Sequence, residues 1–173
     1  MGNMFTLDTL KQNYDNYEDR MLAAWVGKPD KFLFYKMAFQ KFSIGGVERF
    51  AVVWSWWAFF FTFWFFLYRK AYIAALVAFV LAILAALIPI IGPLAFMIGM
   101  GMSAVYFLYK HYKKLKLKIE LMTDDEDKRL EYMLMEGGYL GWVPWVVAIL
   151  TILSILFMGV VYSHAGASFQ YYY

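Results

Sequence analysis

Cysteine is absent from this chain of 173 residues. Its absence excludes disulfides, thiolate-held metal ions, iron–sulfur clusters and cysteine nucleophiles. Lysine, arginine, aspartate and glutamate are also absent from three long stretches, residues 50–68, 71–109 and 137–173. Stretches of this length without a charged side chain are typical of segments that lie in a lipid bilayer.

The absence of charge within these stretches also bears on chemistry. Charged side chains inside membrane spans commonly mark ion pathways, proton relays and catalytic sites. The two histidines, His111 and His164, would lie at opposite faces of a bilayer and could not share a haem or a metal ion. Met97, Met100 and Met102 are expected to pack in a helix rather than to bind a metal. We predict no catalytic residue, no cofactor and no metal, and a protein that is not an enzyme.

An excess of apolar residues is the main feature that is present. They make up 63% of the chain, against about 45–50% in soluble domains. The 16 Lys and Arg and the 13 Asp and Glu all fall in residues 1–49, 69–70 and 110–136. A soluble fold could not cover so much apolar surface, so the sequence predicts an integral membrane protein. The net charge of +3 gives no indication of nucleic-acid binding.

The N-terminal segment, residues 1–46, is predicted to form amphipathic helices at the membrane surface. Residues 6–27 place apolar side chains at three- and four-residue spacing, and Gly27 ends this helix. Pro29 stands in the first turn of a second helix, residues 31–42, in which aromatic residues are interleaved with lysines. A Ser-Ile-Gly-Gly linker then leads to the membrane region. The acidic start lacks the pattern of a secretory signal.

Residues 50–68 are mostly aromatic, with twelve Phe, Trp and Tyr in nineteen positions. Nineteen residues at about 1.5 Å each would just cross a hydrocarbon core of roughly 30 Å. Only Arg69 and Lys70 separate this segment from the next, and tryptophan prefers the membrane interface to the bilayer centre. We favour a re-entrant or interfacial helix, with a full fourth span as the alternative. The residues that define this aromatic membrane segment are Trp54, Trp56, Trp57, Trp64 and Tyr68.

Residues 71–109 are too long for one span. They are divided by Ile88-Pro89-Ile90-Ile91-Gly92-Pro93, whose prolines and glycine break helical hydrogen bonding, so we expect a hairpin of residues 71–88 and 93–109. Small residues at a spacing of four let helix backbones pack closely. They are expected to pack the hairpin within the chain, with packing on a partner as the less favoured alternative. These residues are Ala74, Ala78, Ala82 and Ala86 in the first helix and Ala95, Gly99 and Ser103 in the second.

A basic stretch, residues 110–118, is expected to extend the second hairpin helix out of the bilayer. Thr123 and Glu126 fit a capping box, which predicts a charged helix over residues 124–136 that ends at Gly137. Lys and Arg favour the cytoplasmic side of a membrane, and a binding site for anionic lipid or an acidic partner is the alternative role. The predicted cytoplasmic basic anchors are Arg69, Lys70, Lys110, Lys113, Lys114, Lys116 and Lys118.

The last charge-free stretch predicts a final span over residues 142–162 and an uncharged tail, residues 163–173. The membrane domain then covers residues 47–162, with residues 110–138 as a cytoplasmic helical insert. With the basic segments in the cytoplasm, the C-terminus lies outside. The predicted fold class is all-α: a polytopic helical membrane protein with three full transmembrane helices and one re-entrant aromatic helix, or with four transmembrane helices.

Several motifs resemble those of one family. They are Val26-Gly27-Lys28, Lys31-Phe32-Leu33-Phe34-Tyr35-Lys36, Trp57-Ala58-Phe59-Phe60-Phe61, Trp64-Phe65-Phe66-Leu67-Tyr68-Arg69-Lys70-Ala71-Tyr72 and Tyr109-Lys110-His111-Tyr112-Lys113-Lys114. Over residues 20–115 the chain resembles the small bacterial inner-membrane proteins catalogued as domain of unknown function 2628. Members often carry Gly-Pro where this chain has Phe61-Thr62-Phe63. The resemblance implies a location in the bacterial inner membrane and supplies no activity.

Together these observations indicate a protein that offers surfaces for interaction but has no catalytic residues. We expect a non-enzymatic accessory or scaffold subunit of an inner-membrane complex, which binds another membrane protein or a second copy of itself through helix faces. The alternative is a small-solute or lipid transporter or pore, active as an oligomer. Its few polar groups at membrane depth would be Thr62, Ser103, Thr151 and Ser154.

Overall fold

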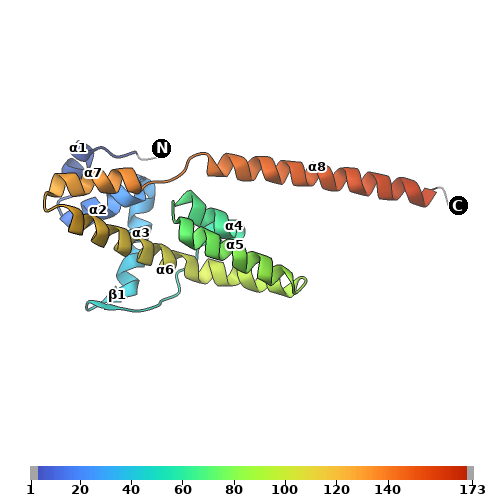
Figure 1. Ribbon diagram of the computed structural model, residues 1–173, viewed down its shortest axis with the longest axis horizontal. Helices are drawn as coiled ribbons and strands as arrows, with labels where there is room; N and C mark the ends of the chain where they lie inside the picture. Colours follow the sequence, from blue (N-terminus) through green and yellow to red (C-terminus); the bar gives the residue numbers. More distant parts are fainter. Residues whose placement is uncertain (1–3, 171–173) are drawn as a thin grey trace. The chain divides into compact units, whose positions relative to one another are not determined.

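The computed structural model describes residues 4–170, with the side chains of residues 4–162, and within them the predicted all-helical class is confirmed (Figure 1). The chain divides into two compact units, residues 1–140 and 141–173. The elements in chain order are α1 (Leu7–Asn13), α2 (Tyr17–Val26), α3 (Pro29–Phe42), β1 (Ser43–Ile44), β2 (Val47–Glu48), α4 (Trp56–Tyr68), α5 (Tyr72–Ala86), α6 (Ile91–Met122), α7 (Glu126–Glu136) and α8 (Val143–Gln170).

Four helices and the end of a fifth form a bundle that is rich in charged side chains. We call it the polar bundle: α1, α2, α3, α7 and residues 110–122 of α6. Figure 1 shows these helices gathered around the C-terminal half of α6. Each helix is amphipathic and buries one apolar stripe in this group. The residues buried almost completely include Leu10, Met21, Trp25, Ile119, Leu130 and Met133.

The single helix predicted over residues 6–27 is wrong, because the structure divides it into α1 and α2. At the break, Arg20 Nε donates a hydrogen bond to the Tyr14 carbonyl at 2.7 Å, and Arg20 Nη2 donates to the Asp15 carbonyl at 3.2 Å. These bonds satisfy carbonyls that the end of a helix leaves unpaired. Gly27 ends α2 as predicted, and its φ of 69° lies in the left-handed region that glycine adopts without strain.

The segment after α2 agrees with the sequence prediction only in part. Pro29 begins α3 as predicted. The Ser-Ile-Gly-Gly segment, expected to be a linker, instead begins a hairpin in which β1 pairs antiparallel with β2. Gly45 and Gly46 have φ values of 62° and 80°, as the favoured two-residue hairpin turn requires.

A second group consists of α4, α5 and the charge-free part of α6, residues 91–109, and we call it the apolar bundle. Ser55 caps α4, since its hydroxyl accepts a hydrogen bond from the Ala58 N–H. The Ser55 N–H donates to the Gly101 carbonyl of α6 at 2.9 Å. The Trp54 ring covers the same point, because a Cβ added to Gly101 would lie 3.0 Å from it. The start of α4 is thereby fixed to the middle of the charge-free part of α6.

The backbone breaks inside α4 at Thr62, where φ is 40° and ψ is −113°. A positive φ is uncommon for a β-branched residue. The break falls in Phe61-Thr62-Phe63, which contains neither glycine nor proline. The aromatic segment is therefore two short helical pieces rather than one continuous rod.

The predicted hairpin is confirmed: α5 and α6 pack side by side and residues 87–90 join them (Figure 1). Pro89 lies in the turn and Pro93 lies in the first turn of α6. The helices approach closely at Gly92, where an added Cβ would lie 1.9 Å from the Ala85 carbonyl oxygen. Only glycine fits at this contact.

The predicted small-residue stripes coincide only in part with the packed faces. Ala78 is buried, Ala74, Ala82 and Ser103 are half-buried, and Ala86, Ala95 and Gly99 are exposed. A Cβ added to Gly99 would meet nothing within 4 Å, so the prediction that Ala95 and Gly99 pack the hairpin within the chain was wrong. The contact face of α6 is displaced because Trp54 and Phe59 pack on Gly101 instead.

The long helix α6 continues from its charge-free part through the basic stretch, as predicted, and has 32 residues. The capping box predicted at Thr123 and Glu126 is wrong. The N-cap of α7 is Asp125, whose carboxylate accepts from the Asp127 N–H at 3.0 Å, while the Thr123 hydroxyl accepts from the Asp125 N–H at 3.3 Å. Gly137 follows α7 as predicted.

The helix α8 contains the predicted final span and continues to Gln170. An 18-residue apolar window within Val143–Tyr162 contains no buried residue. By length and composition, α6 and α8 could each cross a membrane, whereas α4 and α5, with 13 and 15 residues, are shorter apolar helices. The number of crossings, three or four, stays a prediction.

Candidate functional site

The Tyr-Arg-Lys motif at the end of α4 lies where the apolar bundle meets the polar bundle. The sequence predicted Arg69 and Lys70 as basic anchors at a membrane interface. Arg69 is only 5% exposed, so its side chain contacts protein rather than lipid headgroups. We call Tyr68, Arg69, Lys70 and the groups that they contact the junction.

Arg69 bonds to the end of α2. Its Nη1 donates to the Val26 carbonyl at 2.9 Å, and its Nη2 donates to the Trp25 carbonyl at 3.5 Å. The guanidinium carbon lies 4.3 Å from the centre of the Trp25 ring and 4.9 Å from that of Tyr35. Carbonyls at a helix C-terminus carry partial negative charge, and aromatic faces attract cations. The buried cation is therefore stabilised by dipoles and rings rather than by a carboxylate.

The remaining donor of this guanidinium stays unsatisfied. Arg69 Nε is buried and has no hydrogen-bond partner in the described part of the chain. Leaving a buried donor unpaired costs about 1–3 kcal/mol. The side chain keeps its position because two carbonyls and two rings offset that cost.

Lys70 bonds to the end of α7. Its ammonium donates to the Met135 carbonyl at 3.0 Å and to the Gly137 carbonyl at 2.5 Å. Burial lowers the pKa of Lys70, while the nearby Glu136 carboxylate acts in the opposite direction. The two consecutive cations of the motif thus cap two different helices, Arg69 on α2 and Lys70 on α7.

Two glycines let the end of α7 approach the end of α2. The Gly138 N–H donates to the Trp25 carbonyl at 2.9 Å. A Cβ added to Gly137 would lie 2.6 Å from the Met133 carbonyl oxygen and 2.7 Å from Trp25 Cα. The predicted helix end at Gly137-Gly138 is therefore also a contact between backbones of different helices.

Tyr68 completes the junction with an aromatic stack. Its ring lies 5.3 Å from that of Tyr139 at an angle of 28°. The Lys28 ammonium lies 4.2 Å from the centre of the Tyr139 ring and 5.8 Å from that of Tyr68. The Tyr68 carbonyl accepts from the Leu140 N–H at 2.9 Å. Of the other residues predicted for the aromatic membrane segment, Trp54, Trp56 and Trp57 are exposed and Trp64 is half-buried.

The basic stretch of α6 pairs with carboxylates of other elements. Lys116 Nζ lies 2.5 Å from Glu18 Oε1, and Lys113 forms an ion pair with Glu48. Exposed ion pairs contribute about 0–1 kcal/mol each, so these pairs orient α2 and the hairpin on α6 more than they stabilise the fold. No ion pair is formed within the described residues by Lys110, Lys114 and Lys118.

A groove of about 820 Å³ lies between α2, α3 and α6. Its walls carry charges of both signs, including the ion pair of Lys36 with Asp19 at 2.6 Å. Aromatic rings also line it, and Phe39 lies 5.2 Å from the Tyr109 ring. Lys114 lines the groove with an exposed side chain. The groove therefore offers an unpaired cation beside aromatic surface.

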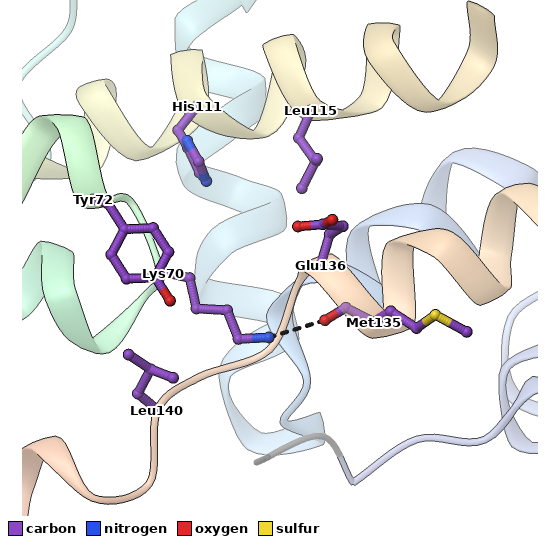
Figure 2. A pocket seen from close by; sticks show the side chains of 7 residues that line it. All are labelled: Lys70, Tyr72, His111, Leu115, Met135, Glu136 and Leu140. Carbon is purple, nitrogen blue, oxygen red and sulfur yellow. Dashed lines mark hydrogen bonds between the residues drawn. The ribbon is translucent and has the colours of Figure 1, made fainter. Parts of the chain in front are cut away.

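A smaller pocket of about 390 Å³ lies beside the junction (Figure 2). Burial lowers the pKa of His111, and the charges of Arg69 and Lys114 act in the same direction. His111 follows the charge-free part of α6, and its imidazole makes no hydrogen bond among the described residues. The pocket is lined by Lys70, Tyr72, His111, Leu115, Met135, Glu136 and Leu140.

The described side chains form no candidate metal site. Residues 4–162 contain no group of three or more His, Asp or Glu that could hold a metal ion. Met100 is buried in the apolar bundle. The His164 side chain lies outside the described residues.

The partners of Arg69 were not found from the sequence. Trp25 and Val26 lie 44 and 43 positions before it, and no spacing rule links residues so far apart. The high aromatic content of α3 was noted as a membrane-surface signal, whereas Tyr35 packs against this cation. The one signal in the sequence that could have indicated a buried Arg69 is its place directly after an apolar helix with no carboxylate nearby.

Comparisons with known proteins found nothing similar: no protein-family model matches the chain, and no curated protein or solved structure does. The resemblance to domain of unknown function 2628 therefore stays a prediction from its motifs.

Proposed function

We propose that this chain is a non-enzymatic accessory or scaffold subunit of a bacterial inner-membrane complex. In this proposal the apolar bundle and α8 lie in the bilayer, the polar bundle lies at the cytoplasmic surface, and the C-terminus is periplasmic. The observation that carries it is the junction, where Arg69 and Lys70 bond to backbone carbonyls of α2 and α7. Cations held in this way fix helices to one another, and such a rigid platform suits a protein whose role is to hold others.

Three contacts support a re-entrant course for residues 50–68. At the entry, the Arg49 N–H donates to the Phe42 carbonyl of the polar bundle. Midway, the Ser55 N–H bonds to Gly101 in the charge-free part of α6. At the exit, Arg69 bonds to α2, again in the polar bundle. A segment whose two ends meet the same bundle enters the bilayer and returns, which favours three full spans, in α5, α6 and α8.

Thiol labelling tests this topology, because the natural chain has no cysteine. Single substitutions Val47→Cys, in the hairpin that follows α3, and Leu121→Cys, in the polar bundle, place a thiol at sites that are 70% and 80% exposed. Both are expected to resist an impermeant maleimide in intact cells and to react after the membrane is opened. Ile88→Cys, in the hairpin turn and 59% exposed, is the control and should react from outside. Labelling of Val47→Cys in intact cells would favour four spans.

The groove between α2, α3 and α6 is the proposed docking surface for an acidic segment of a partner subunit. Lys114 lines it without an ion pair among the described residues. Lys114→Glu is expected to reduce recovery of the partner about tenfold, since juxtaposed like charges cost several kcal/mol. Recovery is measured by purification from native membranes in mild detergent, followed by quantitative mass spectrometry.

Lys118→Glu provides the matched control for this substitution. It makes the same charge change one turn further along α6, at an exposed position outside the groove. It should leave partner recovery unchanged. An unaltered chain that purifies as a monomer with no stoichiometric partner would refute the proposed function.

The transporter alternative is less well supported by the polar groups at membrane depth. The hydroxyls of Ser103, Thr151 and Ser154 each donate to the carbonyl four residues earlier, at 2.6–2.8 Å. Hydroxyls bonded to their own helix are the ordinary arrangement in lipid and do not form a polar pathway. We therefore favour the accessory role.

A further inference from the structure

The pocket beside the junction lies at the boundary between the two bundles. Lys70 and Tyr72 line it at the start of α5, and His111 lines it directly after the charge-free part of α6. Glu136 lines it from the last turn of α7. If the apolar bundle is in the bilayer, as proposed above, this boundary lies at the depth of the lipid headgroups.

The pocket holds groups of both charge signs that remain available. Lys70 uses two of its three N–H donors on carbonyls of residues 135 and 137. The His111 imidazole makes no hydrogen bond among the described residues, and burial lowers its pKa, which favours the neutral form. Figure 2 shows these two side chains and the Glu136 carboxylate around the same space. With one cation and one anion, the lining has no net charge.

Glu136 stands where a helix disfavours an anion. It is the last residue of α7, whose last turn carries no basic residue. The carbonyl end of a helix carries partial negative charge, so a carboxylate there is stabilised by a nearby cation. Glu136 is exposed and forms no ion pair with the described cations. The Lys70 ammonium bonds to the neighbouring carbonyls rather than to this carboxylate, so Glu136 can still pair with a cationic ligand group.

An apolar track leads away from the pocket along α5. Tyr72 is followed at helical spacing by Leu76, Val80 and Ile83, which are 64%, 48% and 54% exposed. These side chains lie on one side of the helix, starting at the pocket. A ligand with a polar head and a long apolar tail fits this combination.

We propose that the pocket binds the headgroup of phosphatidylethanolamine, and that the acyl chains lie along the exposed face of α5. The phosphate accepts hydrogen bonds from Lys70 and His111, and the primary ammonium donates to Glu136. Phosphatidylcholine has a cationic group but no N–H to donate, and phosphatidylglycerol has hydroxyl donors but no cation, so neither gives Glu136 a hydrogen bond from a cationic donor. The inference rests on the membrane location proposed above.

Native mass spectrometry of the full chain in detergent tests the proposal. Phosphatidylethanolamine, phosphatidylcholine and phosphatidylglycerol with identical acyl chains are added in turn. The first is expected to bind at least about tenfold more tightly than either of the others, the effect of one charge-assisted hydrogen bond. Glu136→Gln should remove this preference, whereas Glu131→Gln, an exposed position on the same helix, should keep it.

Each other outcome has a definite meaning. Equal binding of the three lipids, tighter binding of phosphatidylglycerol, or a preference that survives Glu136→Gln would overturn the lipid site. Those results would leave the membrane proposal standing as long as the chain is extracted only by detergent. A chain that fractionates as a soluble protein would refute the membrane location itself.

Discussion

Replacing Arg69 with methionine is expected to lower the free energy of unfolding of the unit of residues 1–140 by about 2–4 kcal/mol. The substitution leaves the Val26 carbonyl buried without its donor, at about 1–3 kcal/mol for each such group. It also removes a desolvated cation from the Trp25 and Tyr35 rings, worth up to about 2 kcal/mol for each good contact. Loss of the unpaired Nε donor offsets about 1–3 kcal/mol of this cost. The measurement is chemical unfolding in mild detergent, followed by tryptophan fluorescence.

Two further variants make this prediction specific. Arg69→Lys keeps the charge but loses the planar fork that reaches two carbonyls, so it should fall between the natural chain and Arg69→Met. Lys118→Met removes an exposed cation from α6 and should change stability by less than about 0.5 kcal/mol. If Arg69→Met were as stable as Lys118→Met, the junction would not hold the two bundles together.

Gly92→Ala and Gly99→Ala are expected to change stability in opposite directions, although both lie on α6. At Gly92 the new Cβ would meet the Ala85 carbonyl oxygen at 1.9 Å, and the backbone must move, at a cost of about 2–3 kcal/mol. At Gly99 the Cβ meets nothing within 4 Å. There alanine should stabilise the helix by up to about 1 kcal/mol, its ordinary advantage over glycine.

The same unfolding measurement compares the two alanine variants, each serving as the control for the other. A similar loss for both would mean that the exposed face of α6 at Gly99 contacts another helix, as the less favoured sequence interpretation held. No loss for Gly92→Ala would contradict the close approach of α5 and α6 at the turn.

Local signals explain which parts of the fold could be predicted. The turn between α5 and α6 follows from two prolines and a glycine, and the end of α2 follows from Gly27. The continuous course of α6 follows from its uninterrupted helical composition between Pro93 and Thr123. Each of these features is decided by residues within a few positions of one another, so the sequence alone contains them.

Long-range contacts explain which parts could not be predicted. Small residues occur on two neighbouring faces of α6, at Gly99 and at Gly101, and the sequence pattern favoured the first. The choice is made by Trp54, which comes from another element and packs on Gly101. Arg69 is a second case. Its charge alone predicts a position at the membrane interface, whereas its burial depends on Val26, a partner that lies far away in the sequence.

The unbroken length of α6 has a mechanical consequence. Its 32 residues at about 1.5 Å each form a rod of about 48 Å, and the two bundles are built on its two halves. Because Arg69 also fastens them beside this rod, a tilt of α6 would move the polar bundle as one body. In the membrane location proposed above, α6 would act as a lever that converts a tilt of the helix into a displacement of the groove.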